Sequence, residues 1–455
     1  MKQQKKPRGK KRIVRGALVT TFACAVLAVL GGFSGAGCGG DDGSKVVKVP
    51  QGGGDGGIVQ NASGAQVGTY EPPAEQSGLS GAARDAYDKG WRAWLAGDLQ
   101  GAKSGFNEAI MKDAKSHASH YSLAAVLERL GDRSGAQQEY RASFSVKSDY
   151  EPGMCAYALS LAHAGRTGEG DTFLTDKHQK LPKSARITTC LAEVKSLAND
   201  SGTAQQLAQD ALRIEPDYKD AMVTIARDHY RARRMDLAKY ALQAILDGFG
   251  ESSPPRDPQN AEAHLLRGLI EREEGLRILA MKDFEAARSR RPDMVEAIIQ
   301  TGAMKLEAGN VAEALPLLEG AVRYAPVNPL AHLNLGDAYR LAGRPTEAKK
   351  EFDTALSQDS SLAVTHYDLG LLYLFSPNVP GMNAASQVST AIHELETYKQ
   401  MKGVKPTPGQ TDDVDELLSR AKAKQAEMKN AAGVAATAGP AAGKTGKDAG
   451  APPKK

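Results

Sequence analysis

The chain has 455 residues, which is too long for one ordinary globular core, so it holds either several domains or a repeat architecture that grows in one dimension. Its 58 Lys and Arg residues outnumber its 54 Asp and Glu residues, but eight of the basic residues lie in residues 1–37, which contain no acidic residue. The remainder has 50 basic and 54 acidic residues, and this balance argues against a nucleic-acid-binding protein.

The N-terminus has the pattern of a secretory signal. Met1–Arg15 is basic, and Gly16–Phe33 is apolar and rich in Ala, Val and Leu. The sequence Ser34-Gly35-Ala36-Gly37-Cys38 resembles the lipobox of bacterial lipoproteins. This resemblance implies that residues 1–37 are a signal peptide and that the Cys38 thiol carries a diacylglyceryl group. The alternative is an uncleaved transmembrane anchor, because the apolar stretch is close to the about 20 residues that a spanning helix needs.

Lipidation would determine where the protein works. Two or three acyl chains anchor a protein stably, because each buried methylene contributes about 0.8 kcal/mol. Gly39 follows Cys38, at the position where an Asp would resemble the inner-membrane retention signal of enteric bacteria. We therefore expect an outer-membrane anchor with the protein facing the periplasm, and we favour the inner membrane less.

Residues 38–80 comprise this cysteine and a Gly-, Ser-, Gln- and Pro-rich stretch. It has too few apolar residues to build a core, so we expect a flexible linker.

Residues 81–402 repeat with a period of 34. Small residues share one register, which shifts by eight after the fifth position: Ala102, Ala136, Gly170, Ala204, Ala238, Ala280, Ala314 and Ala348. The clearest unit has Leu335-Gly336-x-x-Tyr339 followed by Ala348-x-x-x-Phe352. This pattern resembles the tetratricopeptide repeat (TPR), a helix–turn–helix unit in which small residues let two helices approach and a large one fills the gap. The resemblance implies an all-α fold, a right-handed superhelical solenoid.

Nine repeats fit this register. They are predicted to start near Ala83, His117, Glu151, Ala185, Lys219, Ala261, Val295, Pro329 and Ala363. Repeats three to five match the consensus least. Insertions interrupt the period at residues 249–260 and 376–387. Residues 412–430 include an amphipathic stretch that we expect to form a capping helix. Residues 431–455, rich in Ala, Gly, Pro and Lys, are expected to be a disordered tail.

Catalytic patterns are not evident. Residues 438–445 match a loose phosphate-loop pattern but have no preceding strand and no room for a following helix. Four histidines occupy position 4 of their repeats, namely His120, His264, His332 and His366. Stacked repeats would hold them too far apart for one metal ion, and we interpret them as packed polar side chains facing the partner helix. We therefore expect no enzymatic activity, cofactor, metal or small-molecule substrate.

The TPR resemblance implies a concave groove lined by the first helix of each repeat. Three zones follow from the groove positions. The first is aromatic and comprises Tyr87, Trp91, Trp94 and Tyr121; the second is charged and comprises Asp220, Arg227, Arg231, Glu262, Arg272 and Glu273; the third is apolar and comprises Leu330, Leu333, Leu341, Tyr367, Leu371, Leu374 and Phe375. We predict that the aromatic and apolar zones bind protein partners by burial. The alternative for each zone is that the chain's own linker or tail packs into the groove.

Two cysteines remain once Cys24 leaves with the signal peptide and Cys38 carries lipid. Cys155 and Cys190 are 35 residues apart, at positions 5 and 6 of neighbouring first helices. An oxidising compartment favours a disulfide between them if both side chains lean toward the shared interface. Two buried free thiols are the alternative.

The repeat number, lipobox and low-complexity ends resemble the TPR lipoproteins of the adventurous gliding-motility apparatus. This resemblance implies a non-catalytic scaffold that binds other envelope proteins through its groove and the membrane through its lipid. A pilotin-like factor for a type IV pilus secretin is one alternative. An adaptor for peptidoglycan-remodelling enzymes is another.

Overall fold

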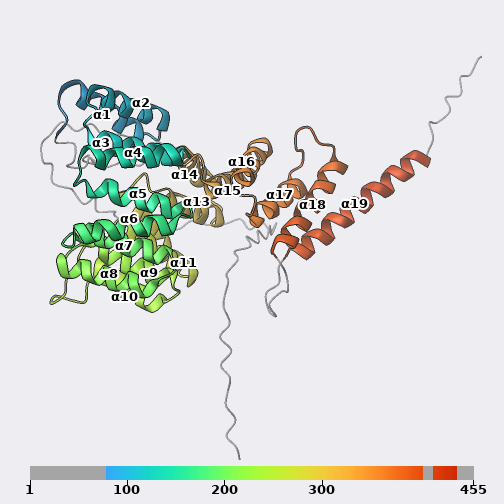
Figure 1. Cartoon of the computed structure of the whole chain (residues 1–455). Coiled ribbons are helices and arrows are strands. Elements are labelled where there is room, and N and C mark those ends of the chain that lie inside the picture. Colours follow the sequence, from blue (N-terminus) through green and yellow to red (C-terminus); the bar gives the residue numbers. More distant parts are fainter. Residues whose placement is uncertain (1–77, 403–412, 438–455) are drawn as a thin grey trace, which may run out of the picture. The chain divides into compact units, whose positions relative to one another are not determined.

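The computed structural model describes residues 78–402 and 413–437 (Figure 1). Within these ranges there are nineteen helices and no strands. The first eighteen form nine antiparallel pairs: α1 (Gly81–Leu95), α2 (Leu99–Lys112), α3 (His117–Arg129), α4 (Arg133–Val146), α5 (Glu151–His163), α6 (Thr167–Lys180), α7 (Ala185–Leu197), α8 (Ser201–Ile214), α9 (Lys219–Arg231), α10 (Met235–Leu246), α11 (Ala261–Glu273), α12 (Arg277–Arg290), α13 (Val295–Glu307), α14 (Val311–Tyr324), α15 (Pro329–Leu341), α16 (Pro345–Gln358), α17 (Ala363–Phe375) and α18 (Ala384–Lys402). The last helix is α19 (Val414–Thr437).

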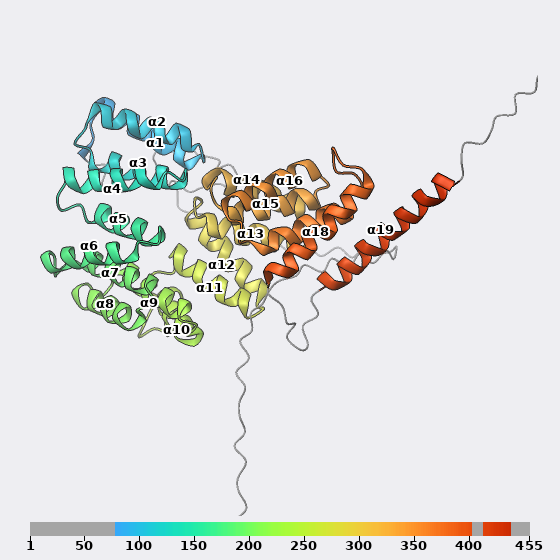
Figure 2. The same ribbon diagram turned by 45° about the vertical axis from the view of Figure 1, so that its right-hand side comes forward.

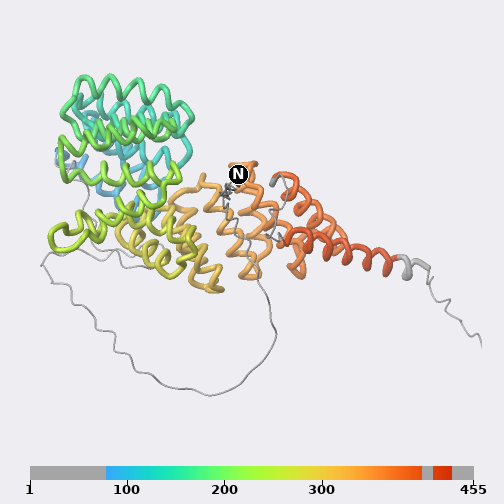
Figure 3. Tube along the Cα trace, turned by 90° about the horizontal axis from the view of Figure 1, so that it is seen from below, coloured from blue at the N-terminus to red at the C-terminus, as the bar shows by residue number. Residues whose placement is uncertain are grey.

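The predicted all-α solenoid of nine repeats is confirmed. In repeats two to nine the first helix begins at the predicted residue, and only α1 begins earlier, at Gly81. Each pair packs against the next along the chain, as the tube in Figure 3 shows. Helix α19 continues to Thr437, beyond the predicted bound of 430, because residues 430–437 are rich in Ala, the best helix former.

Close helix approach explains the small residues of the period. A Cβ atom on Gly336 of α15 would lie 2.6 Å from the ring of Phe352 in α16, and Phe352 is fully buried. Gly268 and Phe284 make the same contact in the sixth repeat. A side chain at these glycines would push the two helices apart, so the glycine and the phenylalanine are needed together.

The turn inside each pair uses a backbone with positive φ. Gly343 adopts φ 71° between α15 and α16, a conformation that glycine takes without strain. The equivalent positions of repeats four and five hold Asn199 at φ 63° and Arg233 at φ 58°. The turns of these two repeats therefore depart from the consensus, because a non-glycine residue adopts the left-handed conformation in each.

The four position-4 histidines tie the two helices of their repeats together. Nδ1 of each ring lies within hydrogen-bond distance of a carboxylate on the second helix. The four pairs are His120–Glu139 (2.6 Å), His264–Asp283 (2.9 Å), His332–Glu351 (2.6 Å) and His366–Glu394 (2.7 Å). Nε2 of His264 and His332 also faces a backbone carbonyl, that of Pro258 and Pro326. Carboxylates and carbonyls only accept hydrogen bonds, so the imidazolium form, which donates from both ring nitrogens, suits the surroundings of His120 and His332.

Stability should fall as the pH rises through the titration of two of these rings. The hydrogen bond to Glu139 raises the pKa of His120 against the opposing effect of burial. Burial alone would lower the pKa of His332, but the hydrogen bonds to Glu351 and to the Pro326 carbonyl outweigh it and raise the pKa. A raised folded-state pKa stabilises the fold fully below the unfolded pKa of about 6.5, and that contribution is lost as the pH passes the folded pKa.

Urea unfolding from about pH 6 to 9 measures this effect, and a His120→Gln, His332→Gln variant is the matched control. The free energy of unfolding should decrease with pH more steeply for the natural chain than for the variant. Burial also raises the pKa of Glu271, to about 7, so its contribution makes stability fall with rising pH in the acidic part of this range, equally in both proteins. Equal slopes in the two proteins would contradict the prediction.

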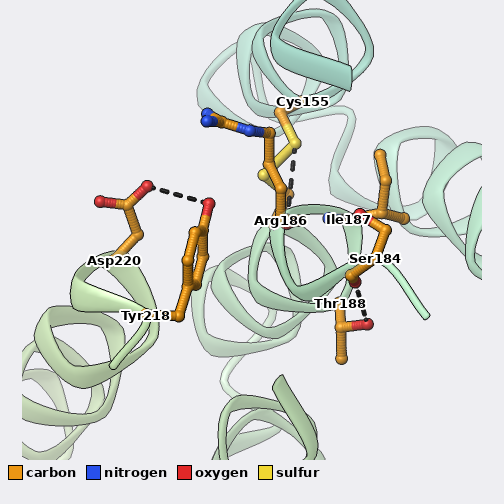
Figure 4. Close-up of a disulfide and its surroundings, with 8 residues drawn as sticks. Cys155, Ser184, Arg186, Ile187, Thr188, Tyr218 and Asp220 are labelled. Carbon is orange, nitrogen blue, oxygen red and sulfur yellow. Dashed lines mark hydrogen bonds between the residues drawn. A yellow bond between two sulfur atoms is a disulfide. The ribbon is translucent and has the colours of Figure 1, made fainter. Parts of the chain in front are cut away.

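A disulfide joins the third and fourth repeats. Cys155 of α5 and Cys190 of α7 are bonded, and their Cα atoms are 5.6 Å apart, within the range that an unstrained bridge requires. Figure 4 shows the Cys155 sulfur beside the backbone carbonyl of Arg186. An oxidised sulfur has no proton to donate, so that approach, at 3.9 Å, is a packing contact.

Repeats one and two also contact the sixth and seventh repeats. Arg129, the last residue of α3, donates hydrogen bonds to the carbonyl oxygens of Asp293 (3.2 Å) and Tyr324 (3.5 Å). The Tyr324 hydroxyl in turn donates to the carbonyl oxygen of Leu95, at 2.7 Å. We call this contact the seam. It brings the turn between α12 and α13 next to the N-terminal helices.

Candidate partner-binding site

An aromatic cavity of about 430 Å³ lies at the seam. Helices α1 and α3 supply most of its wall, because their groove positions carry large rings on adjacent, parallel-running first helices. The lining residues are Tyr87, Trp91, Trp94, Phe106, Ala118, Tyr121, Ser122, Ala125, Glu128, Arg129, Tyr150, Arg291 and Asp293. A concave site with an apolar wall and a few charged groups suits a side chain or a short segment of a partner.

The rings on the inner side of the cavity are held firmly. Tyr87 is 2% exposed, its hydroxyl shares a hydrogen bond with Ser122 Oγ at 2.8 Å, and its ring packs on Phe106. The Tyr121 ring packs against Tyr150 at a centroid distance of 5.9 Å and against Tyr140 at 5.6 Å. Burial and Glu128 raise the pKa of Tyr140, so its hydroxyl stays protonated and donates to Glu128. The cavity wall is therefore pre-formed.

The two tryptophans pack against the first hydrophobic core without being fully buried. The guanidinium group of Arg129 lies over the Trp94 ring, 5.5 Å from its centroid. The carboxylate of Asp293 lies 3.9 Å from Arg129 and 3.8 Å from Arg291. Charged groups of both signs therefore border the aromatic wall.

The structure brings the four predicted aromatic residues into one cavity, with different roles. Tyr87 is a buried wall residue, whereas Trp91, Trp94 and Tyr121 are partly exposed. Sequence reasoning missed Tyr150, which precedes α5 in the turn from α4, and also missed Arg291 and Asp293. The 34-residue register could have suggested Tyr150, because it lies next to a repeat start. No local pattern indicates residues from the sixth repeat.

The side chains of the charged zone form ion pairs and hydrogen bonds with other residues of the same chain. Arg227 of α9 pairs with Glu193 of α7 at 2.9 Å and with Glu262 of α11, and Arg231 also pairs with Glu193 at 2.6 Å. Burial alone would raise the pKa of Glu193, but these two arginines lower it. The rest of the zone is also engaged: Asp220 with Tyr218, as in Figure 4, Arg272 with Glu307, and Glu273 with Arg233. The pairs made by Arg227, Arg231 and Arg272 link neighbouring first helices.

The chain's own helix α19 covers much of the apolar zone. Tyr367, Leu371 and Leu374 of α17 share one buried cluster with Val414, Leu417, Leu418 and Ala421 of α19. The Tyr367 hydroxyl donates to the Asp413 carboxylate at 2.9 Å. Figure 2 shows α19 beside α18, with which it also packs. Helix α19, which contains the predicted capping helix, therefore covers this end of the groove.

This arrangement corrects the expectation that the apolar zone is open to partners. Leu333 is only 8% exposed, whereas Leu330 and Phe375, each 47% exposed, remain accessible. The physical reason is that a solenoid ends in an unpaired apolar face, and an amphipathic helix covers that face.

Other predictions concern residues outside the described ranges. Cys38, the signal peptide, the linker up to residue 77 and the phosphate-loop-like residues 438–445 all lie there. Over residues 78–402 and 413–437, no helix is both long and apolar enough to span a membrane. In the same ranges, no group of three or more His, Cys, Asp or Glu side chains is arranged to hold a metal ion.

A comparison with known protein families agrees with the repeat pattern in one part of the chain. The tetratricopeptide repeat family matches residues 305–363, which include the whole eighth repeat. Among solved structures, the Cut9–Hcn1 hetero-tetramer of the APC/C is 14% identical, with 76% of this chain and 79% of that chain covered and a TM-score of 0.49. The human IFIT1 dimer is also 14% identical, with coverages of 78% and 85% and a TM-score of 0.43.

A bacterial structure, Pseudomonas aeruginosa pilF, is 21% identical, with 48% of this chain and 95% of that chain covered and a TM-score of 0.31. These identities, coverages and TM-scores describe similarity alone. The family match over residues 305–363 and the nine stacked helix pairs show that the described part of the chain folds as a TPR solenoid.

Proposed function

We propose that the chain is a non-catalytic, lipid-tethered scaffold that holds an envelope protein at the aromatic cavity and serves a gliding-motility machine of the outer membrane. The observation that carries the binding role is the cavity itself, in which Trp91 and Trp94 stand partly exposed beside Arg129. Tryptophan, tyrosine and arginine in a partly buried pocket are the residues that dominate binding energy at protein interfaces.

The lipid tether rests on the basic leader and on the small residues before Cys38. A tether at the start of a long linker would let the solenoid stay close to the membrane while its groove faces the periplasm. The gliding role rests on resemblance of architecture, so phenotype is its test. Loss of pilus-independent movement in a null strain would support it, whereas loss of secretin multimers would favour the pilotin-like alternative.

Site-specific photocrosslinking in intact cells tests the binding role. A photoreactive phenylalanine analogue at Trp94 should give a discrete adduct with one envelope protein. The matched control places the same analogue at Ile278 of α12, which is 87% exposed and does not line the cavity. Absence of an adduct at Trp94, or the same adduct at both positions, would reject the cavity as the binding site.

Truncation of the exposed ring should then weaken partner binding. Trp94→Ala removes a large aromatic contact, and loss of such a residue typically costs about 2 kcal/mol or more, roughly a thirtyfold loss of affinity. Affinity capture of the partner identified by crosslinking measures the loss, with circular dichroism to confirm that the helices are retained. Full capture by a folded Trp94→Ala protein would contradict the prediction.

Replacement of Cys38 tests the tether. Cys38→Ser should leave the mature protein without lipid, so it should leave the membrane fraction after high-salt washing, because no acyl chain remains to be buried. Membrane fractionation and metabolic labelling with a fatty acid measure the outcome. If Cys38→Ser still behaves as an integral membrane protein, the apolar stretch at Gly16–Phe33 acts as an uncleaved anchor.

A further inference from the structure

We propose that residues 69–74 of the chain's own linker occupy the aromatic cavity, so that a partner must displace them. The described chain starts at Gly78, and Leu79 is already buried in the first hydrophobic core. Helix α1 begins two residues later and carries Tyr87, Trp91 and Trp94 into the cavity. The linker therefore enters the fold on the same helix that builds the cavity wall.

The linker has the reach to return along this helix. From Gly81 to Trp94, α1 advances by about 20 Å at 1.5 Å per residue. Eight residues of extended chain before Gly78 span about 25 Å at 3.1 Å per residue. A segment running antiparallel to α1 would thus bring residues 70–73 level with the tryptophans.

The composition of the segment fits the cavity. Residues 69–74 read Thr-Tyr-Glu-Pro-Pro-Ala, and Tyr70 is the only aromatic residue between Cys38 and Gly78. Consecutive prolines favour the polyproline II conformation, which aromatic grooves recognise because little further entropy is lost on binding. Glu71 adds an acidic group, and residues 56–77 contain no Lys or Arg. Arg129 and Arg291 border the cavity, as do Glu128 and Asp293, so the lining offers basic partners for Glu71 without carrying a net positive charge.

At the other end of the groove, a segment of the chain itself covers a predicted partner zone. Helix α19 covers Tyr367, Leu371 and Leu374, so the chain already shields one of its two predicted partner zones with its own terminal segment. A short connection would present residues 69–74 to the cavity at an effective concentration of order millimolar, so even a weak intramolecular contact would be populated. Docking of the linker in the cavity does not depend on the proposed function. Competition between the linker and a partner rests on the proposed function.

Tryptophan fluorescence tests the docking directly, because Trp91 and Trp94 are the only tryptophans in the chain and both line the cavity. The detergent-solubilised mature chain is compared with a Tyr70→Ser, Pro72→Gly, Pro73→Gly variant. The variant should show a red-shifted emission maximum and a larger acrylamide quenching constant, since water and quencher gain access to the rings. A matched control, Ile58→Ser with Val59→Ser, removes apolar residues from the distant part of the linker and should leave both readouts unchanged.

Identical emission and quenching in the triple variant and the natural chain would overturn the proposal. A difference that disappears on dilution would also overturn it, because it would assign the occupant to a second copy of the chain. The test needs no partner, so it is independent of the proposed function. If both hold, the triple variant should capture the crosslinked partner more tightly than the natural chain does, whereas failure of the function alone would leave the fluorescence difference intact.

Discussion

Replacing Gly105 with Ala should destabilise the first repeat by about 2–3 kcal/mol, because the added methyl group meets backbone and not a movable side chain. A Cβ atom at Gly105 in α2 would lie 2.5 Å from Gly90 Cα in α1 and 3.1 Å from the carbonyl oxygen of Ala86. Neither atom can move without displacing α1. Since α1 carries Trp91 and Trp94, the displacement should also disturb the aromatic cavity.

The measurement is urea unfolding followed by circular dichroism and by tryptophan emission. Gly320→Ala is the matched control, because Gly320 also lies inside a second helix, α14, and a Cβ atom there would meet nothing within 4 Å. That change should be neutral or should stabilise the fold by up to about 1 kcal/mol, the difference in helix propensity between Ala and Gly. If the two variants behave alike, the close contact between α1 and α2 is wrong.

Removal of the Cys155–Cys190 bridge should lower the free energy of unfolding by about 2–4 kcal/mol, because the bridge restricts the unfolded chain over 35 residues of sequence. The effect should be concentrated in repeats three and four, which the bridge joins directly. Helices α5 and α7 also pack directly on each other, so the loss should propagate to their partners α6 and α8.

Chemical denaturation of a Cys155→Ala, Cys190→Ala variant measures this loss. Adding a reductant should lower the stability of the natural chain toward that of the variant and should leave the variant unchanged. Thiol labelling of the unfolded, unreduced mature protein gives a second readout, and no free thiol is expected. Two free thiols per chain would show that the cysteines are not paired in the native protein.

The sequence by itself determined the repeat architecture and most helix starts. A 34-residue period constrains residues such as Gly336 and Phe352, which must fit each other locally, so the pattern is visible without a structure. The pairing of position-4 histidines with acidic residues was visible in the same way, because Glu139, Asp283 and Glu351 each follow their histidine by 19 residues.

Only the tertiary structure decided what closes the aromatic cavity and what covers the apolar zone. Arg129 meets Asp293 across 164 residues of sequence, and that contact depends on small rotations accumulated over successive repeats, which no single repeat encodes. Likewise, amphipathicity predicts that α19 has an apolar face, but not which surface it covers. Tyr367, Leu371 and Leu374 look like groove residues in sequence and become core residues because packing α19 against them removes their apolar surface from water.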